Sequence, residues 1–322
     1  MSGFSTTTNE HLIRSDLWSM QIKELLLEEL QGTKYVDFIT DFPDGEYIHI
    51  PSIGQMEVQD YQEGQAVQYT AMATGDWKFR VSEYKSSGTY ITDKMKQDSF
   101  YSAQLTSRFV PRMTRAIASS METDVLAIGV NGQTANNNNA INGASHRWVG
   151  HGTNDIIVPA DFAAAKYALR MAQVPQTNLV AIVHPSTILT LETMTNLVNL
   201  SYNPRWEGVV NEGATSGIHF KFNVFGWDVY SSTFLPEGIT ETIDGNTVTN
   251  GVANIFFSAA GGDILPFKGL IRQAPRVESE RNKDLQRDEY IMTARWGFGF
   301  YRPENFVTIL TDPAAAYAAA TA

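Results

Sequence analysis

Hydrophobic side chains recur every three to four residues along one stretch, from Asp98 to Ile128. This is the period of a helix with one buried face. Asp98 and Ser99 offer an N-terminal cap, while Gly129 and the pair Asn131-Gly132 end the pattern. At 1.5 Å per residue the helix would be about 45 Å long, which predicts a flat or extended molecule. The buried stripe consists of Phe109, Met113, Ala116, Ile117, Met121, Val125 and Ile128.

A proline and a row of arginines interrupt the simple amphipathic pattern of this helix. Pro111 removes one helical hydrogen bond and crowds the preceding turn, so we expect a kink there. Arg108, Arg112 and Arg115 fall on a second face, roughly 130° from the apolar stripe at about 100° per residue. The ordinary interpretation is a solvated basic face that pairs with nearby acids, and the alternative is contact with a polyanion.

The N-terminal part of the chain divides into a polar tail and an amphipathic segment. Residues 1–9 are small and polar, so we expect a mobile tail. From His11 to Leu30 the apolar residues have helical spacing, and Gly32 is the stop. Periodicity leaves open whether this arm packs on its own subunit or on a neighbour.

Strict alternation of apolar and polar residues replaces the helical period between Glu46 and Ile91. It is clear in Ile48–Ile50, Gln55–Val58 and Trp77–Ser82, and it predicts strands with one solvated face. The segment is poor in large aliphatic residues and is interrupted by glycines. We therefore expect a long hairpin projecting from the body, with little in an isolated monomer for it to pack on.

An asparagine-rich loop follows the long helix, at residues 129–143, and its composition gives little reason for it to order by itself. An α/β pattern comes next. It predicts a helix at Phe162–Met171 capped by Asp161, a buried strand at Asn178–Val183, and a helix at Thr187–Val198 with Pro185 near its first position.

The α/β unit continues through a loop and several strands. Tyr202–Gly217 is rich in Gly, Asn and Pro and contains Trp206, which favours an exposed tip. We expect strands over Phe220–Tyr230 around Gly226, a tight hairpin at Ile243–Val248, and a strand at Ile255–Phe257. Together these segments predict one compact unit.

Long strands are expected again from Lys268 onward, interrupted by a charged patch from Arg276 to Glu289. Gly297 and Gly299 alternate with phenylalanines and so share one strand face, which suits the close approach of another backbone. The alanine-rich tail after Asp312 is expected to be frayed.

Composition limits the classes of function. The chain has 322 residues, 43% of them hydrophobic, which is enough for a sizeable core. A net charge of −11 argues against a sequence-specific reader of nucleic acid but not against a container for it. There is no cysteine, so disulfides and thiolate sites are excluded. With no leader-like N-terminus or long apolar run, we expect no membrane association and no export.

Candidate catalytic and metal-binding residues do not converge. His146 and His151 have no third ligand nearby in the sequence. His184 sits at a strand end before a helix N-terminus, a position where anions bind in open α/β sheets, but a His-Pro pair there also forms an ordinary turn. Ser82 and Lys85 match Ser-x-x-Lys without its partner motifs. The sequence also lacks a phosphate-binding glycine loop, a His-Glu-x-x-His motif and a nucleophile elbow. We predict neither catalysis nor a cofactor nor a metal.

The order of these parts resembles a tailed-bacteriophage major capsid protein of the Hong Kong 97-type fold. The most family-like phrases are Gly226-Trp227-Asp228-Val229-Tyr230-Ser231-Ser232 and the aromatic-glycine run before Arg302-Pro303-Glu304. The resemblance implies an α+β subunit with an N-terminal arm at 1–45, an extended β-hairpin loop at 46–91, and a peripheral domain at 92–158 with the spine helix 98–128. An α/β axial domain at 159–265 would follow, then return strands of the peripheral domain and the tail at 266–322.

The resemblance also implies a function and partners. The subunit would assemble in the host cytoplasm through pentamers and hexamers into an icosahedral virion head that encloses double-stranded DNA without sequence-specific binding. A separate scaffolding protein and a portal would be its partners, and the sequence leaves open whether a decoration protein binds outside. Alternatives are a nanocompartment shell of the same fold around protein cargo, or a soluble α/β enzyme. Arg108, Arg112 and Arg115 would face the interior or the DNA, and the candidate inter-subunit residues are Trp77, Lys78, Phe79, Lys85, Tyr202, Trp206, Arg276, Glu278, Arg281 and Arg287.

Overall fold

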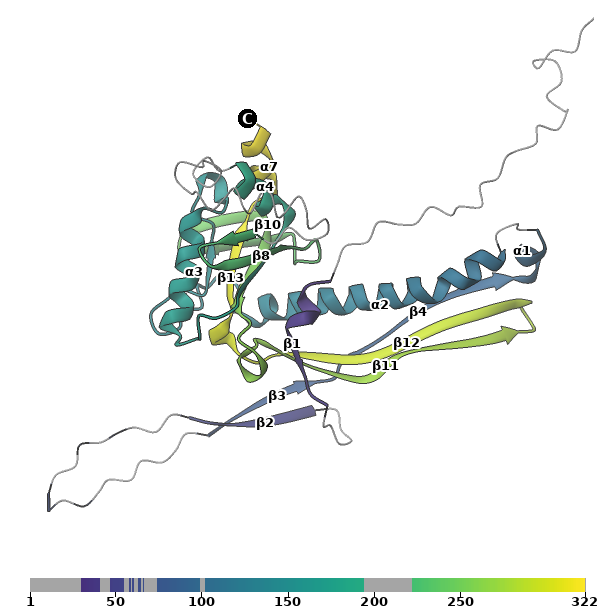
Figure 1. The fold of residues 1–322 in the computed structure, drawn as a ribbon, viewed down its shortest axis with the longest axis horizontal. Coiled ribbons are helices and arrows are strands. Elements are labelled where there is room, and N and C mark those ends of the chain that lie inside the picture. The colour runs from purple at the N-terminus through teal and green to yellow at the C-terminus, as the bar shows by residue number, and fades with distance from the viewer. Residues whose placement is uncertain are drawn as a thin grey trace, which may run out of the picture.

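The computed structural model describes residues 30–40, 47–54, 74–98, 102–193 and 222–321, with a few single positions between 55 and 73; side chains at 102–108, 222–223 and 321 lie outside the description. An α/β body occupies one end of the molecule (Figure 1). A long helix and a long hairpin run side by side away from the body, and a second, two-stranded hairpin leaves in a different direction.

The spine helix α2 spans Ser102–Gly132, 31 residues. The predicted long helix is therefore confirmed, but it begins at Ser102 instead of Asp98, and of the two predicted C-terminal ends it passes Gly129 and stops at Gly132. Asp98 instead ends a short helix, α1 (Asp93–Asp98). Gly129 does not end α2. The glycine instead leaves room for the Phe306 ring, because a Cβ atom at this position would lie 2.7 Å from Phe306 Cε2. The helix continues through Pro111, and the sharpness of a bend there stays a prediction.

A four-stranded sheet lies beneath α2, in the order β1-β11-β12-β4. The sequence predicted that the charged patch interrupts the long strands, but the patch instead forms the far half of one continuous hairpin, β11–β12. β4, which was predicted to be part of the projecting loop, belongs to this sheet instead. Its strands are β1 (Val36–Phe38), β4 (Glu83–Thr92), β11 (Phe267–Asn282) and β12 (Arg287–Phe300).

The body is built on a seven-stranded sheet in the order β5-β13-β10-β6-β8-β7, with β9 paired to β10. The predicted strands at 178–183 and 255–257, the strands on either side of Gly226 over their described residues, and the tight hairpin at 243–248 are confirmed. Asp244 and Gly245 both have positive φ, 49° and 87°, as a tight hairpin turn requires. The strands are β5 (Arg147–Val149), β6 (Leu179–Val183), β7 (Phe222–Val224), β8 (Trp227–Ser231), β9 (Ile239–Ile243), β10 (Asn246–Ser258) and β13 (Val307–Thr311).

Two of these strands correct the predicted division of the chain. β5 was assigned with the spine, and β13 was assigned to the strands that return to the spine, yet both join the sheet of the body. They pair with each other in parallel, Ile309 opposite Trp148. Segment 266–322 therefore contributes strands to both sheets, and between β4 and β13 the chain passes from one sheet to the other three times, before β5, before β11 and before β13.

In the part of the chain that the structure describes, three helices, α3, α4 and α7, belong to the body. α3 (Pro159–Met171) begins two residues before the predicted cap, and the Asp161 carboxylate in its first turn accepts a hydrogen bond from the Val158 N–H at 2.9 Å. α4 (Pro185–Thr193) has its proline at the first position, as predicted. The alanine-rich tail is not frayed. It forms α7 (Pro313–Thr321), which packs on α4 and buries Ala316.

One continuous core joins the two sheets. The C-terminal half of α2 packs on one face of the body sheet, whose other face is covered by α3. The rest of the α2 stripe packs on β12, except for Ala116, which was predicted to be buried in the stripe but is exposed. The spine is therefore the element that both sheets share. Its buried partners include Val180, Ile182, Phe257, Phe267, Met292, Ala294, Trp296 and Phe298.

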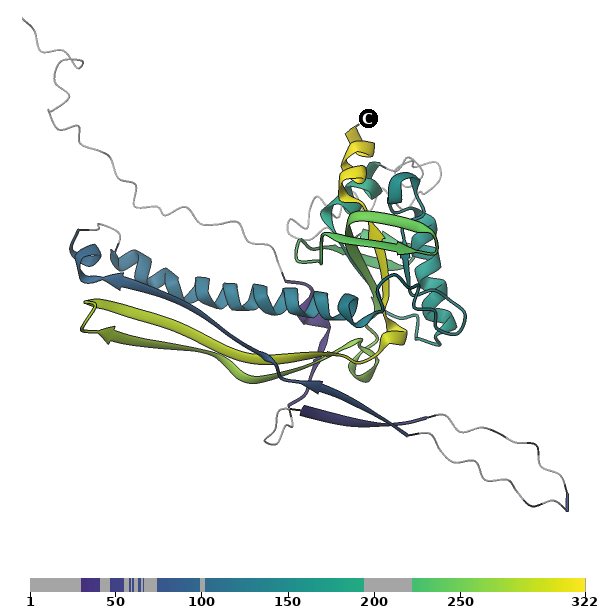
Figure 2. The ribbon, with the colours of Figure 1, turned by 180° about the vertical axis from the view of Figure 1, so that it is seen from behind.

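The projecting hairpin is confirmed over its described part, β2 (Tyr47–Ile53) antiparallel to β3 (Thr74–Arg80). Seen from behind, it leaves the molecule near the junction of body and spine, on the side of the four-stranded sheet away from α2 (Figure 2). The predicted strand Gln55–Val58 and the amphipathic arm His11–Leu30 lie outside the described residues, apart from Val58 and Leu30.

Candidate assembly surfaces

The root of the projecting hairpin is seated on two glycines of β12. A Cβ atom at Gly297 would lie 2.7 Å from the Val81 Cα, and one at Gly299 would lie 2.6 Å from the Trp77 ring. Any side chain at Gly297 would push the backbone after β3 away from the sheet. The close backbone approach predicted for these glycines is thus confirmed, and the approaching segment is the hairpin of the same chain.

Aromatic side chains fix the seat further. The Trp77 indole N–H donates to the Phe300 carbonyl at 2.9 Å, and its ring lies 4.9 Å from that of Tyr301. Phe79 is buried in a small cluster with Ile48 and other aliphatic residues. The expectation that the monomer offers the hairpin little to pack on is therefore wrong for its root. Since Trp77 and Phe79 are used inside the chain, their contact with a neighbour stays a prediction.

The opposite face of the hairpin is exposed and carries both polar and apolar side chains. Lys78 is exposed, and His49 pairs with Asp76 at 2.8 Å, both more than half exposed. Tyr47 and Ile53 on the same face are also exposed. The hairpin thus offers one face to its own sheet and one to its surroundings.

The far end of the β11–β12 hairpin carries an ion-pair network that holds α1 in place. Arg281 donates two hydrogen bonds to Asp93, at 3.1 and 2.7 Å, and also contacts Asp288, which pairs with Lys96. The hydrogen bond from Arg281 lowers the pKa of Asp93, and the pKa of Arg281 rises in turn. The network is largely exposed, so its contribution is to position α1 rather than to add much stability.

The remaining charged candidates also have partners within the chain. Arg276 and Glu278 are 3.4 Å apart and exposed. Arg287 donates to Glu289 at 2.7 Å, which lowers the pKa of that carboxyl, and its guanidinium lies 4.5 Å from the centre of the Tyr90 ring. These are the solvated pairs expected of an exposed patch, and a role between subunits stays a prediction.

Lys85, another candidate, turns toward the spine. Its ammonium donates to both carboxylate oxygens of Asp124, at 2.9 and 2.7 Å, and lies over the Trp296 ring. The Trp296 indole N–H donates to the same carboxylate at 3.1 Å. This contact ties β4 and β12 to α2.

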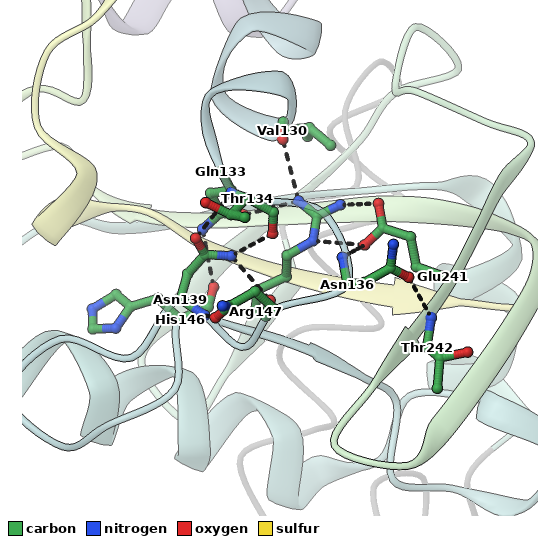
Figure 3. A network of polar contacts seen from close by, with 10 residues as sticks. Val130, Gln133, Thr134, Asn136, Asn139, His146, Arg147, Glu241 and Thr242 are labelled. Atoms are coloured by element: carbon green, nitrogen blue, oxygen red, sulfur yellow. Dashed lines mark hydrogen bonds and ion pairs between the residues drawn. The ribbon is translucent and has the colours of Figure 1, made fainter.

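The structure also shows a network that sequence reasoning missed, at the junction of spine and body (Figure 3). Arg147 has only 2% of its side chain exposed, and it donates to Glu241 at 2.7 and 3.1 Å. It also donates to the Val130 carbonyl at 3.2 Å, near the end of α2, where a positive charge is favourable. A single arginine in a short strand gives no sign of this in the sequence.

The asparagine-rich loop completes this junction. Asn139 bonds to both the N–H and the carbonyl of Thr134, and the Thr242 N–H donates to Asn136 at 3.0 Å (Figure 3). Asn138 reaches Asp244 on the next hairpin turn. The loop was predicted to have little reason to order by itself. The partners that order it are on β9 and its turn, far away in sequence.

A family model described as phage capsid protein matches residues 77–311 of the sequence, more than half of the chain. The chain belongs to the phage capsid protein family. No curated protein sequence matches it significantly.

Solved structures agree with this phage capsid fold over almost the whole chain. The capsid of cyanophage P-SCSP1u superposes with a TM-score of 0.71 at 13% identity, over 95% of this chain and 96% of that one. Cyanophage Pam1 capsid gives 0.71 at 12%, over 98% and 100%. A chain of Mycobacterium phage Che8 gives 0.66 at 16%, over 93% and 97%. The α+β, Hong Kong 97-type fold implied by the resemblance is thus confirmed.

Family membership decides between the functional classes that the sequence left open. A phage capsid protein is a structural component of the virion shell, built from many copies of itself, and not an enzyme. The three histidines considered as catalytic or metal-binding candidates have contacts within the chain. His146 is buried and its pKa is lowered by burial, His151 contacts Asp161, and His184 lies 3.3 Å from Glu237. Among the described residues, no three His, Cys, Asp or Glu side chains cluster as a metal site would need.

The predicted roles of the loop aromatics and of the α2 arginines stay predictions. Tyr202 and Trp206 lie outside the described residues, and so does the side chain of Arg108. Arg112 is exposed and Arg115 is partly buried on α2. In the part of the chain that is described, no helix has the length and apolarity needed to cross a membrane.

Proposed function

We propose that this phage capsid protein is the major capsid protein of a tailed phage, and that it assembles through pentamers and hexamers into an icosahedral head enclosing double-stranded DNA. The observation that carries this proposal is the arrangement of the subunit: a body and a long spine that share one core, with a hairpin anchored at its root and projecting away from both (Figures 1 and 2). A projecting arm has a use in a closed shell, where a neighbour can lie beneath it.

Assembly also accounts for the composition of the exposed surfaces. The outer faces of the hairpin and of the β4–β12 sheet present apolar side chains, among them Ile53, Tyr84 and Ile291. Each such contact is small. At about 25 cal/mol per Å² of apolar area, a shell can be stable as a whole although each shared contact is weak.

Further partners follow from the same proposal. A separate scaffolding protein would guide closure, and a portal would occupy one vertex. The net charge of −11 suits a container that must not adhere to its DNA, so DNA is enclosed without sequence-specific binding. The head is assembled in the host cytoplasm.

Electron microscopy of the purified chain, expressed with and without the phage's scaffolding protein, tests the proposal. We expect pentamers, hexamers or closed shells, and DNA in particles taken from infected cells. A chain that stays a monomer or small oligomer under both conditions would contradict it. Closed shells that hold protein cargo and no DNA would instead support the nanocompartment alternative.

A further inference from the structure

The N-terminal arm is fixed to the spine at one buried carboxylate. Glu122 of α2 is fully buried and accepts backbone hydrogen bonds from Gln31 at 2.8 Å, Gly32 at 2.5 Å and Thr33 at 2.9 Å. Charge-assisted hydrogen bonds of this kind are among the stronger ones. Three of them on one carboxylate set both the position and the register of the arm root on the helix.

The root also has a direction along the spine. Val36 pairs with Phe267, and a Cβ atom at Gly129 would lie 2.9 Å from the Phe267 ring, so this end of the root is level with the C-terminal turns of α2. Gln31 is level with Glu122, seven residues earlier on α2. Followed backward, the chain therefore moves toward the N-terminus of α2.

The next charged residues of α2 in that direction are arginines. Arg115 precedes Glu122 by seven residues, two helical turns, and so lies on the same face, with Arg112 one turn further. The Arg115 Nε is buried and has no hydrogen-bond partner among the described residues. A buried guanidinium N–H without an acceptor favours a partner that is not among the described residues.

The chain that comes just before the root supplies suitable acceptors. Glu24, Glu28 and Glu29 lie in the last two turns of the amphipathic segment His11–Leu30, with Lys23 as the cation among them. If this segment is helical, as its periodicity predicts, it rises 1.5 Å per residue like α2. With Gln31 level with Glu122, Glu24 then comes level with Arg115.

We propose that the acidic amphipathic segment at residues 11–30 docks along α2 of its own subunit, with Glu24 beside Arg115 and Arg112. The arginine row of the spine is then the binding surface of the arm and not a contact surface for DNA. The occupant belongs to the same subunit because Leu30 is directly continuous with the root held by Glu122. This assignment does not depend on the symmetry or the size of the shell.

Engineered cysteines test the docking, since the natural chain has none. Full-length protein with Glu24→Cys and Arg115→Cys is oxidised and mapped by proteolysis under non-reducing conditions. We expect an intrachain disulfide. The matched control is Glu24→Cys with Ala116→Cys, because Ala116 is exposed and lies about 100° further round the same helix. Equal crosslinking in both proteins, none at Arg115, or a dimer linked between chains would overturn the proposal.

Hydrogen exchange in the full-length chain gives a second, independent measurement. An ion pair at a partly exposed position contributes up to about 1 kcal/mol, so Arg115→Gln should make residues 11–30 exchange up to roughly fivefold faster. Arg115→Glu combined with Glu24→Arg should restore the protection. DNA content of particles should not change in Arg112→Gln/Arg115→Gln. Reduced DNA content with unchanged exchange would assign the row to DNA instead, whether or not the shell geometry is as proposed.

Discussion

At the scale of single residues, the seat of the hairpin depends on the absence of a side chain at Gly297. We predict that Gly297→Ala destabilises the protein by about 1–3 kcal/mol, because the new methyl group would have to displace backbone at Val81 rather than a flexible side chain. Gly88→Ala is the matched control in the neighbouring strand, where the nearest atoms would lie at an ordinary 3.5 Å. Chemical denaturation of both variants checks this, and equal stabilities would contradict it.

The same scale shows where sequence reasoning was sufficient and where it was not. Alternation along β12 placed Gly297 and Gly299 on one face and predicted a close neighbour, since this needs only the period of a strand. Glu122 and Arg147 could not be found in this way. Their partners, Gln31 and Glu241, are about 90 residues away in the chain, so no local spacing joins them.

At the scale of elements, α1 depends on an ion pair that acid should weaken. Arg281 lowers the pKa of Asp93 below its ordinary value of 3.8, so the ionised carboxylate stabilises the contact above that value and the effect is lost as pH falls through the lowered pKa. We predict that α1 exchanges its amide hydrogens faster below about pH 4, after correction for intrinsic rates. In Arg281→Gln this change with pH should disappear; if it persists, the pair is not its cause.

The C-terminal helix gives a second prediction for an element. Ala316 of α7 is buried in the packing of α7 and α4. Ala316→Arg should therefore release α7 and make the C-terminus sensitive to protease, at a cost of about 1–3 kcal/mol for overpacking. Ala319→Arg, at an exposed position of the same helix, should have no such effect. Similar protease sensitivity in the two variants would show that α7 does not need this contact.

Sequence patterns predicted most elements and misplaced their ends for a physical reason. The helical period of apolar residues predicts a helix only as far as buried residues recur. α2 continues past Gly129 because packing against Phe306 outweighs the low helix propensity of glycine. The tail after Asp312 looked frayed because alanine carries little hydrophobic signal, yet small side chains suit close packing of α7 on α4. Tertiary contacts decided both cases.

At the scale of the whole molecule, the hairpin is the part whose function lies outside its own subunit. Deleting residues 54–75 should abolish shell assembly, because the projecting end can no longer reach a neighbour. None of the described residues of this segment belongs to the core that joins the spine to both sheets, so we expect the body to stay folded. Circular dichroism and sedimentation of the deletion variant measure the two effects separately. Closed shells from this variant would refute the role of the hairpin.

The order of the elements was sufficient to predict the fold class. An arm, a projecting hairpin, a long spine helix and an α/β unit follow one another in this order in phage capsid proteins of the Hong Kong 97-type fold. The crossing of β5 and β13 into the body sheet was missed, since sheet membership depends on pairing between segments 160 residues apart rather than on local period. The individual interface residues also depend on a neighbour that one sequence does not contain.

A single-particle reconstruction of the assembled particle, at a resolution that traces the β2–β3 hairpin, tests the central proposal most directly. We predict subunits arranged in pentamers and hexamers, with the body toward each capsomer centre and the hairpin end of each subunit resting on the next. A particle in which every hairpin folds back on its own subunit, or a chain that forms no shell at all, would contradict the proposal.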